Sequence, residues 1–307
     1  MVILGKWEQH TLSLSLKPSS LTISLQSRDG SQVYSFDGEG RLWTAMLEGV
    51  SYRRGLNGKI VAKWQAGAGP DRFGRERRWL APEEAQQIEE RSRQMAGELL
   101  RGLKDGRAMI DAALPESAWK HLERIARFDQ ARYRQDVQAY HQVYLPVGIL
   151  PPDQYMAVVL QATEGCSFNT CTFCDFYRGR RFRIKRPDEF LAHAQAVKEF
   201  LGEGLSLRRT IFLGDANALA APMPRLLDLI EIVHQVYDVE RLGGIYAFLD
   251  GFSGEKKTAE DYARLAQRGM KRIYIGMESG HAELLSILKK PGKPEDVIQA
   301  VRAIKAG

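Results

Sequence analysis

Residues 155–307 repeat one pattern four times, an apolar strand followed by an amphipathic helix. The four strands are expected in the stretches YMAVVLQAT, RRTIFLGD, GGIYAFLD and KRIYIGMES. Continuous apolar strands that alternate with helices predict a parallel sheet covered by helices. Right-handed crossovers wind such a sheet into an open sheet or a partial barrel. The loops that follow the strands then meet at one edge, where α/β proteins place their functional groups.

The N-terminal part of the chain has a different character. Four short strands with hairpin turns are expected within residues 11–65, and they predict a small antiparallel sheet. Two helices follow, one from Pro82 to just before Gly106 and one from Glu116 to Tyr144. The run LPVGILPPDQ then breaks the helical pattern. The predicted organisation is an α+β N-terminal domain at 1–145, a linker at 146–154 and a second domain at 155–307.

All three cysteines of the 307-residue chain lie in one loop, GCSFNTCTFCD, directly after the first strand of the repeat. An odd, clustered set does not make a disulfide framework, and it suits a reducing compartment, so we expect a cytoplasmic protein. Cys166, Cys171 and Cys174 are one ligand short of a structural zinc site or an electron-transfer cluster. A metal centre with an open coordination site is typical of catalysis. The alternatives are a non-catalytic metal-binding module, with zinc or a structural cluster, and a chance group of structural cysteines.

This loop resembles the cluster loop of the radical S-adenosylmethionine (radical SAM) superfamily, because it follows the first strand and has an aromatic residue, Phe173, before its last cysteine. The superfamily usually has C-x3-C-x2-C, whereas this chain has C-x4-C-x2-C, and its subfamily is not assigned. The resemblance covers residues 155–307 and implies an α/β fold, a partial (β/α) barrel with about four β/α units where a complete core has six. The chain ends where a fifth strand is expected, so the barrel is expected to be incomplete at its C-terminus.

The resemblance also implies a chemistry. Cys166, Cys171 and Cys174 would ligate a [4Fe–4S] cluster, and S-adenosylmethionine (SAM) would bind the open iron. Reductive cleavage of SAM would give a 5′-deoxyadenosyl radical that abstracts hydrogen from an unidentified substrate. The electron would come from an external donor such as flavodoxin or ferredoxin. The cofactors supply the difficult chemistry, and the protein supplies binding and orientation.

Five residues match cofactor-binding positions of the superfamily. Phe173 is expected beside the adenine. Gly214 and Asp215, in the segment GDAN after the second strand, are expected at the methionine amino group. Glu278 and Ser279, after the fourth strand, are expected at the ribose hydroxyls. The competing interpretations are packing against the barrel wall for Phe173 and turn or helix capping for the polar residues.

The charge distribution leaves the substrate class open. The formal net charge is +6, and six cations lie within Arg178–Arg186, interleaved with Tyr177 and Phe182. A second basic stretch, Asp71–Trp79, lies in the N-terminal part. Such runs favour either phosphate binding or a solvated face. We expect a small-molecule substrate, with an RNA-modifying enzyme as the alternative, and Asp250 either points at this substrate or caps a turn. No apolar run approaches the roughly 18–20 residues of a membrane span.

Overall fold

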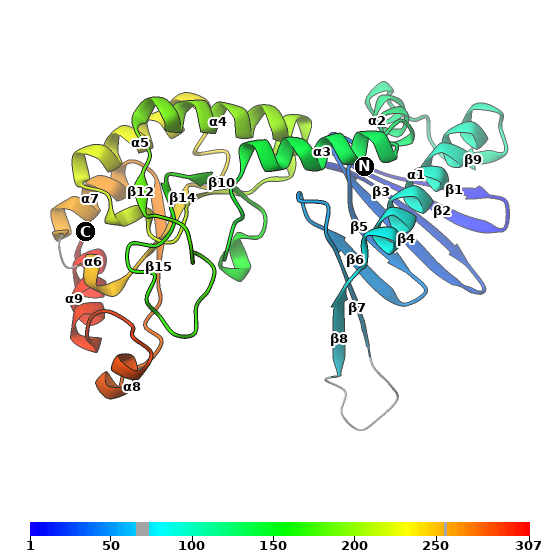
Figure 1. The fold of residues 1–307 in the computed structure, drawn as a ribbon. Coiled ribbons are helices and arrows are strands. Elements are labelled where there is room, and N and C mark those ends of the chain that lie inside the picture. Colours follow the sequence, from blue (N-terminus) through cyan, green and yellow to red (C-terminus); the bar gives the residue numbers. More distant parts are fainter. Residues whose placement is uncertain (66–73, 255–256) are drawn as a thin grey trace. The chain divides into compact units, whose positions relative to one another are not determined.

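A computed structural model describes residues 1–65, 74–254 and 257–307 of the chain (Figure 1). The chain packs into two units, and each has its own main sheet. Unit 1 comprises Met1–Gln142 and Phe200–Leu207, and unit 2 comprises Val143–Glu199 and Arg208–Gly307. None of the described helices combines the length and the apolar character that a membrane crossing requires.

Unit 1 is built on an antiparallel sheet that has nine strands among the described residues, in the order β8-β7-β6-β5-β4-β3-β2-β1-β9. Strands β1 to β8 each pair with their neighbours in sequence, and β9 returns to pair with β1. The strands are β1 (Val2–Trp7), β2 (His10–Lys17), β3 (Ser20–Ser27), β4 (Gly30–Asp37), β5 (Leu42–Leu47), β6 (Val50–Arg54), β7 (Ile60–Gln65), β8 (Arg75–Trp79) and β9 (Ala108–Ile110).

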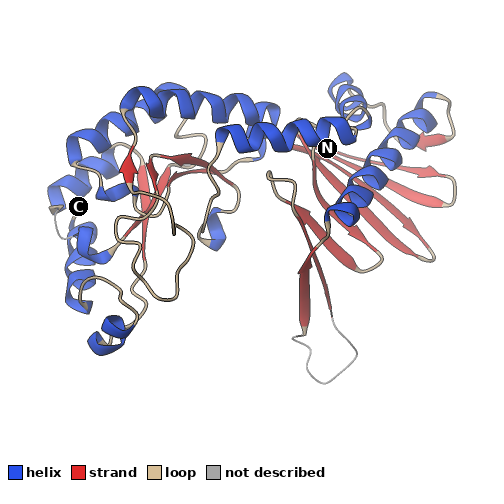
Figure 2. Cartoon of the chain, viewed as in Figure 1, coloured by secondary structure: helices blue, strands red, loops and turns tan. Residues whose placement is uncertain are grey.

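Three helices contribute to the core on one face of this sheet: α1 (Pro82–Lys104), α2 (Glu116–Ala126) and α3 (Gln130–Val143) (Figure 2). Alternation along the strands separates the two faces. In β2, for example, Leu12 and Leu14 are buried in the core, whereas Ser13 and Ser15 stay partly exposed. In β2, the face that the helices leave open is therefore lined by small polar side chains.

The predicted N-terminal elements were wrong in number. The stretch TLSLSLKPSSLTISLQ forms two strands, because a turn at Pro18 and Ser19 separates β2 from β3. The predicted helix from Glu116 to Tyr144 is two helices, α2 and α3. Asp129 starts the second one, since its carboxylate accepts a hydrogen bond from the backbone N–H of Arg132 at 2.9 Å. An aspartate before a helical stretch is a typical N-cap, and it was the missed signal.

A buried ionic network joins the sheet of unit 1 to helices α1 and α3. The Arg41 Nε atom lies 2.6 Å from Asp136 Oδ1, and an Arg41 Nη atom lies 3.4 Å from Asp37 Oδ2. Arg54 contacts Glu89 at 2.7 Å and Asp136 at 3.5 Å. All five side chains are nearly excluded from solvent. Each of the three carboxylates and two guanidinium groups in this network therefore contacts at least one opposite charge, as buried ions require.

Residues Phe200–Leu207 were predicted in the second domain, and they pack in unit 1. Arg41 donates hydrogen bonds to the carbonyl oxygens of Phe200 at 2.6 Å and of Leu201 at 3.3 Å. The carboxylate of Glu39 accepts a hydrogen bond from the backbone N–H of Glu203 at 2.7 Å. The same arginine that anchors the network thus also holds this segment.

Unit 2 contains a sheet of four parallel strands in the order β10-β13-β14-β15. These strands are β10 (Ala157–Gln161), β13 (Thr210–Gly214), β14 (Ile245–Leu249) and β15 (Met270–Ile275). Helices α4 (Pro187–Leu201), α5 (Met223–Val236) and α7 (Ala259–Gln267) follow the first three strands and lie along one side of the sheet (Figure 1). The remaining helices are α6 (Gly251–Gly254), α8 (Ala282–Ile287) and α9 (Pro294–Ala306), with 3₁₀ turns η1 (Pro152–Gln154), η2 (Gly202–Leu207, in unit 1) and η3 (Ala218–Ala220). The predicted parallel sheet of four strands is confirmed.

The two faces of the parallel sheet differ. Leu160, Leu213 and Ala247 are fully buried under the helices. The opposite face has a row of aromatic rings, in which the Phe212 and Phe248 centroids lie 5.1 Å apart and those of Phe248 and Tyr274 lie 6.0 Å apart. This aromatic face ends at the carboxyl edge of the sheet, next to the loop with the cysteines.

Candidate functional site

The loop at residues 165–182 lies between β10 and α4 and holds all three cysteines. Strands β11 (Thr163–Glu164) and β12 (Arg183–Ile184) pair antiparallel and close its base. Gly165 begins the loop with a left-handed φ of 71°. A side chain here would lie 3.0 Å from the carbonyl oxygen of Arg180, so the tight base of the loop requires glycine.

The cysteine loop folds back on itself around Asn169, which has a φ of 54°. Its backbone N–H donates to Cys166 Sγ at 3.4 Å, and its side-chain amide donates to the carbonyl oxygen of Tyr177 at 2.8 Å. A turn between Cys171 and Cys174 follows, with an N–H···O distance of 3.3 Å. Asparagine tolerates the left-handed region better than most residues. The three thiols, all half-buried, are thus gathered within one folded loop.

The thiols influence one another electrostatically. Burial raises the pKa of the Cys171 thiol, and the nearby Cys166 and Cys174 thiolates raise it further. The Lys290 ammonium, which also lies close, lowers the pKa of Cys171. A positively charged metal centre would replace this repulsion by attraction, because thiolate is the form that binds metal.

Among the residues that the structure describes, no three His, Cys, Asp or Glu side chains converge on a point where a single metal ion could bind. A zinc ion holds its sulfur ligands at about 2.3 Å, whereas the cysteines of an iron–sulfur cluster bind different irons.

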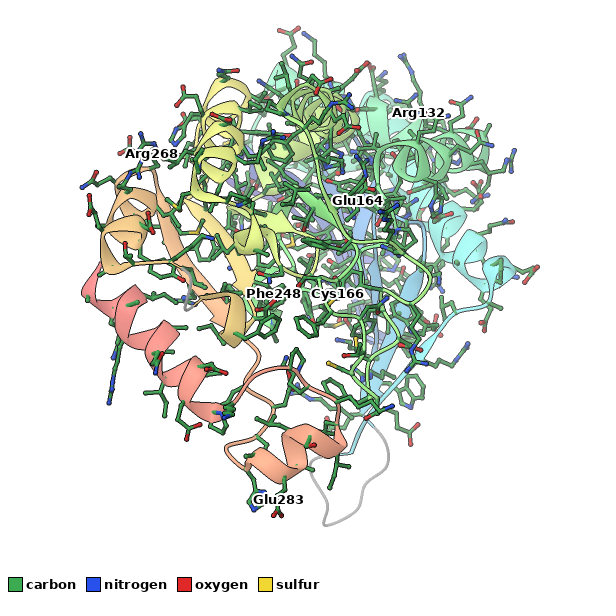
Figure 3. All side chains as sticks on the ribbon, turned by 60° about the vertical axis from the view of Figure 1, so that its left-hand side comes forward. Arg132, Glu164, Cys166, Phe248, Arg268 and Glu283 are labelled. Carbon is green, nitrogen blue, oxygen red and sulfur yellow. The ribbon has the colours of Figure 1, made fainter. Side chains whose placement is uncertain are left out.

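The loops after the other strands reach the cysteine loop. Asp250, which follows β14, accepts a hydrogen bond from Ser167 Oγ at 3.2 Å and another from the side-chain amide of Asn217, which follows β13. The Thr170 hydroxyl donates a hydrogen bond to the carbonyl oxygen of Lys289 at 3.1 Å. The backbone N–H of Thr172 donates one to the carbonyl oxygen of Leu288 at 2.9 Å. The predicted meeting of these loops at one edge is observed. In Figure 3, Cys166 on the cysteine loop and Phe248 on β14 lie on the side of the sheet that faces α8, where Glu283 is labelled.

Asp215 is buried, with 3% of its surface exposed. Its carboxylate accepts hydrogen bonds from the Tyr177 hydroxyl and from Arg180, each at 3.5 Å, and its backbone N–H donates to Thr163 Oγ1 at 2.9 Å. Burial raises the pKa of Asp215 to about 6, although Arg180 opposes this change. Asp215 therefore connects the end of β13 to residues 177–180 of the cysteine loop, which we call its returning limb.

The other predicted cofactor residues lie around this centre. Phe173 is 53% exposed, and Gly214 pairs with Gln161 at the end of the sheet. Glu278 is exposed and accepts a hydrogen bond from Lys290 at 3.1 Å. Ser279 Oγ accepts a hydrogen bond from the backbone N–H of His281 at 3.0 Å, in the turn before α8. The N-cap residue of α8 is His281, and among the described residues no side chain caps this helix.

The family model of the radical SAM superfamily matches residues 160–307. The match covers just under half of the chain, so the part of the chain that contains the cysteine loop and the parallel sheet is similar to this superfamily. The radical SAM match begins within β10 and extends over the cysteine loop and all four parallel strands.

Two of the solved structures that this chain resembles are of the cobalamin-dependent S-adenosylmethionine radical enzyme OxsB. The form with aqua-cobalamin and SAM bound has 22% sequence identity and a TM-score of 0.39, over 50% of this chain and 22% of that chain. The apo form has 12% identity and a TM-score of 0.40, over 97% of this chain and 57% of that chain. The present chain thus spans less than two thirds of the length of OxsB. No curated protein matches the sequence.

Enzymes of the radical SAM superfamily use a [4Fe–4S] cluster and SAM. The cysteine loop of this chain fits such a cluster, because it offers three free thiols that lie close enough to influence one another electrostatically. Cations beside the loop, such as Lys290 and Arg180, suit a centre whose thiolate ligands are negatively charged.

The basic run Arg178–Arg186 of the radical SAM domain is not a free cationic surface. Arg183 pairs with Glu164 and Glu189, and the buried Lys185 also pairs with Glu164. Arg186 pairs with Asp188, and Arg180 pairs with Asp215. Tyr177, predicted as an interleaved aromatic, is buried. In the second basic stretch, Asp71–Trp79, residues 71–73 lie outside the described residues.

Sequence reasoning missed a layer of supporting residues beneath the cysteine loop. His193 Nε2 accepts a hydrogen bond from the backbone N–H of Gln161 at 3.0 Å, and Lys185 donates to the carbonyl oxygen of the same residue at 2.8 Å. Burial lowers the pKa of His193 to about 4, so this histidine is neutral near pH 7. The sequence signal that could have revealed this layer is the polar residue Gln161, which stands at the end of an otherwise apolar strand.

Proposed function

We propose that this chain is a radical SAM enzyme in which Cys166, Cys171 and Cys174 each bind one iron of a [4Fe–4S] cluster and leave the fourth iron for SAM. The observation that carries this proposal is the gathering of all three thiols in one folded loop at the carboxyl edge of a parallel sheet. When bound, the cluster supplies one electron that cleaves SAM to methionine and a 5′-deoxyadenosyl radical, which takes a hydrogen atom from the substrate.

The protein's own residues hold the loop in place for this chemistry. Asp250 links it to the ends of two strands, and Thr170 and Thr172 link it to the segment after α8. A catalytic centre needs such rigid support, since small displacements of reacting groups lower rates strongly. The aromatic face formed by Phe212, Phe248 and Tyr274 offers an apolar surface that would keep water away from a reactive radical.

For Asp215 we propose a role different from direct contact with the methionine ammonium. Its carboxylate already accepts hydrogen bonds from Tyr177 and Arg180. We infer that it positions the returning limb of the cysteine loop and acts on SAM through that limb. The neighbouring Gly214 would then present its backbone to the methionine group.

The remaining contacts with SAM are assigned to Phe173 and Glu278. Phe173 is exposed next to Cys174 and is free to lie against the adenine. Glu278 presents a carboxylate next to Lys290, near Cys171, where it would accept hydrogen bonds from the ribose. Ser279 is the weaker of the predicted pair, because its hydroxyl oxygen accepts a bond from His281.

The ligand assignment is tested by changing each cysteine to alanine and reconstituting the protein with iron and sulfide without oxygen. The unchanged protein should hold about four irons per chain. Each variant should lose the intact cluster and the formation of 5′-deoxyadenosine. Asp175→Ala, in the same loop, is the matched control and should retain the cluster. An alanine variant with four irons and normal 5′-deoxyadenosine would refute the assignment, and one zinc per chain would support the metal-binding module.

The SAM contacts are tested separately by calorimetry on the reconstituted protein. Glu278→Gln should weaken SAM binding about 10- to 150-fold, the range for loss of a charged hydrogen bond. Glu283→Gln on α8 is the control and should leave binding unchanged. If Glu278→Gln binds SAM as tightly as the unchanged protein, the Glu278 carboxylate does not contact SAM and only forms its ion pair with Lys290.

A further inference from the structure

The β6–β8 end of the sheet in unit 1 has two chemically different faces. Arg54 reaches Glu89 of α1, and Arg78 reaches Glu84 of the same helix, so these side chains mark the helix-covered face. Side chains alternate along a strand, and directly paired residues of neighbouring strands share a face. Residues an odd number of positions from Arg54 or Arg78 along the same strand, and the residues paired with them, therefore lie on the open face. They include four cations, which we call the basic strip: Arg53, Lys63, Arg75 and Arg77.

The register fixes how the strip is arranged. Lys63 of β7 lies opposite Arg77 of β8, and Gln65 lies opposite Arg75. Arg53 of β6 lies opposite Val61, which in turn lies opposite Trp79. Three neighbouring strands thus bring their cations together on one surface.

No carboxylate of these strands shares the basic strip. Glu76 is the one acidic residue within β6, β7 and β8, and it lies opposite Trp64 on the other face. Lys63, Arg75 and Arg77 form no ion pair with any described residue. This distinguishes the strip from Arg178–Arg186, where most cations are paired. The three cations Lys63, Arg75 and Arg77 thus carry charge that no described carboxylate neutralises, and such a cluster attracts a polyanion.

Aromatic rings lie beside these cations. Trp79 is 66% exposed, which is unusual for so large an apolar side chain. The ring of Trp43 lies under the guanidinium of Arg53, with 6.0 Å between Cζ and the ring centroid. Charged residues on the edge strand β8 would by themselves discourage aggregation. An exposed tryptophan has the opposite effect, so protection of the edge does not explain the whole surface.

Arg75, Arg77 and Trp79 occupy alternate positions of one extended strand, about 6.8 Å apart. Single-stranded nucleic acid offers a matching repeat of phosphates and unstacked bases, and its binders combine cations with aromatic platforms. A duplex keeps its bases stacked inside and offers only phosphates to such a surface. We propose that the basic strip and Trp79 bind single-stranded nucleic acid, with phosphates on the cations and a base on the indole. The surface lies wholly within unit 1, so this binding is independent of the cluster and of SAM.

The test uses the full chain and fluorescence anisotropy with labelled 12-nucleotide oligo(U) and oligo(dT), titrated at several salt concentrations. Both strands should bind at low salt, and the difference between them shows which nucleic acid is preferred. Lys63→Gln/Arg75→Gln/Arg77→Gln should weaken binding and reduce the slope of log K against log salt by about 2, or 0.7 per cation. Trp79→Ala should weaken binding about 5- to 150-fold with little change in that slope.

The matched control is Lys6→Gln/Lys17→Gln/Arg28→Gln, which removes three exposed cations from the far end of the same sheet and should change binding little. Circular dichroism confirms that each variant is folded. The proposal is overturned if neither strand binds, or if the control weakens binding as much as the strip variant. It is also overturned if Trp79→Ala has no effect, or if a 12-base-pair duplex binds as tightly as the single strands. Binding of phosphatidylserine vesicles in place of the oligonucleotides would assign the surface to a membrane instead.

Discussion

The two sheets of this protein place their polar groups in opposite ways. In the antiparallel sheet of unit 1, polar side chains alternate with apolar ones along strands such as β2, so that polar groups stand on the face of the sheet itself. In the parallel sheet of unit 2, strand β10 is buried at every position, and the polar groups stand in the loops that follow the strands. A surface made by alternation is broad and flat and suits an extended partner. A site made by converging loops is narrow and suits a cofactor with one reactive atom.

This difference predicts that the two units respond differently to the same kind of change. Unit 1 keeps its charged groups paired inside the layer between sheet and helices. In unit 2 the residues of the sheet are mainly apolar, and the buried polar side chains form hydrogen bonds in the loops that follow the strands. Substitutions matched across the units measure how far this contrast holds.

The largest effect on stability is expected from Asp136→Asn in unit 1. It leaves the buried guanidinium groups of Arg41 and Arg54 without a shared carboxylate. Breaking a buried ion pair at one partner costs about 3–5 kcal/mol of unfolding free energy. Hydrogen exchange of unit 1 peptides measures this loss. Glu116→Gln, in an exposed pair with Lys120, is the control and should change stability by less than about 1 kcal/mol. Equal exchange in both variants would mean that the network does not stabilise unit 1.

A leucine pair compares the sheets directly. Leu160 is fully buried in β10, and Leu4 is 51% exposed on β1. Leu160→Ala should cost about 2–5 kcal/mol, because it leaves a cavity in the core. Leu4→Ala should change stability by about 0.5 kcal/mol or less. Urea unfolding with a probe in each unit checks both values. A large effect of Leu4→Ala would show that the open face of unit 1 is covered in solution.

The pH dependence of unit 2 should become steeper in Asp215→Asn. The pKa of Asp215 is raised to about 6, so its stabilising contribution is complete below about pH 4 and is lost as the pH rises through 6. The pKa of His193 is lowered to about 4, so its contribution is complete above about pH 6.5 and is lost as the pH falls through 4. The two contributions oppose each other between these limits.

In Asp215→Asn the pH-dependent contribution of His193 to stability is no longer offset by that of Asp215. The variant should therefore lose up to about 3 kcal/mol more stability than the unchanged apoprotein between pH 6.5 and pH 4, since the Asp215 shift is about two units. Thermal unfolding of the apoproteins at these two pH values measures the difference. Asp228→Asn, exposed on α5, is the control. If Asp215→Asn loses no more stability between pH 6.5 and pH 4 than the unchanged protein, the two residues do not offset each other in this way.

The smallest effect is expected at a helix cap of unit 2. Thr258 Oγ1 accepts a hydrogen bond from the backbone N–H of Asp261 at 3.2 Å at the start of α7. Thr258→Ala should cost about 0.5–2 kcal/mol. Thr11→Ala, exposed on β2, should cost less. Chemical denaturation of both variants ranks them, and the reverse order would show that cross-strand contacts of unit 1 matter more than this cap.

The sequence predicted unit 2 better than unit 1 for a physical reason. Continuous apolar strands between helices leave few topologies, so the four-stranded parallel sheet and the meeting of its loops followed directly. Alternating Ser and Leu residues instead leave the number and ends of strands to weak turn signals such as Pro18. The link from Asp215 to Tyr177 and Arg180 was not predictable, because it depends on how a loop folds back over a strand nearly 40 residues away.

The segment Phe200–Leu207 belongs to unit 1, although the residues on both sides of it belong to unit 2. A chimera that exchanges only residues 1–142 would move Arg41 into a new protein without the carbonyl oxygens of Phe200 and Leu201 that accept its hydrogen bonds. A foreign N-terminal part would in turn leave those carbonyl groups without their donor. Recombination at a single crossover thus cannot transfer unit 1 intact, and the two units have to be inherited together.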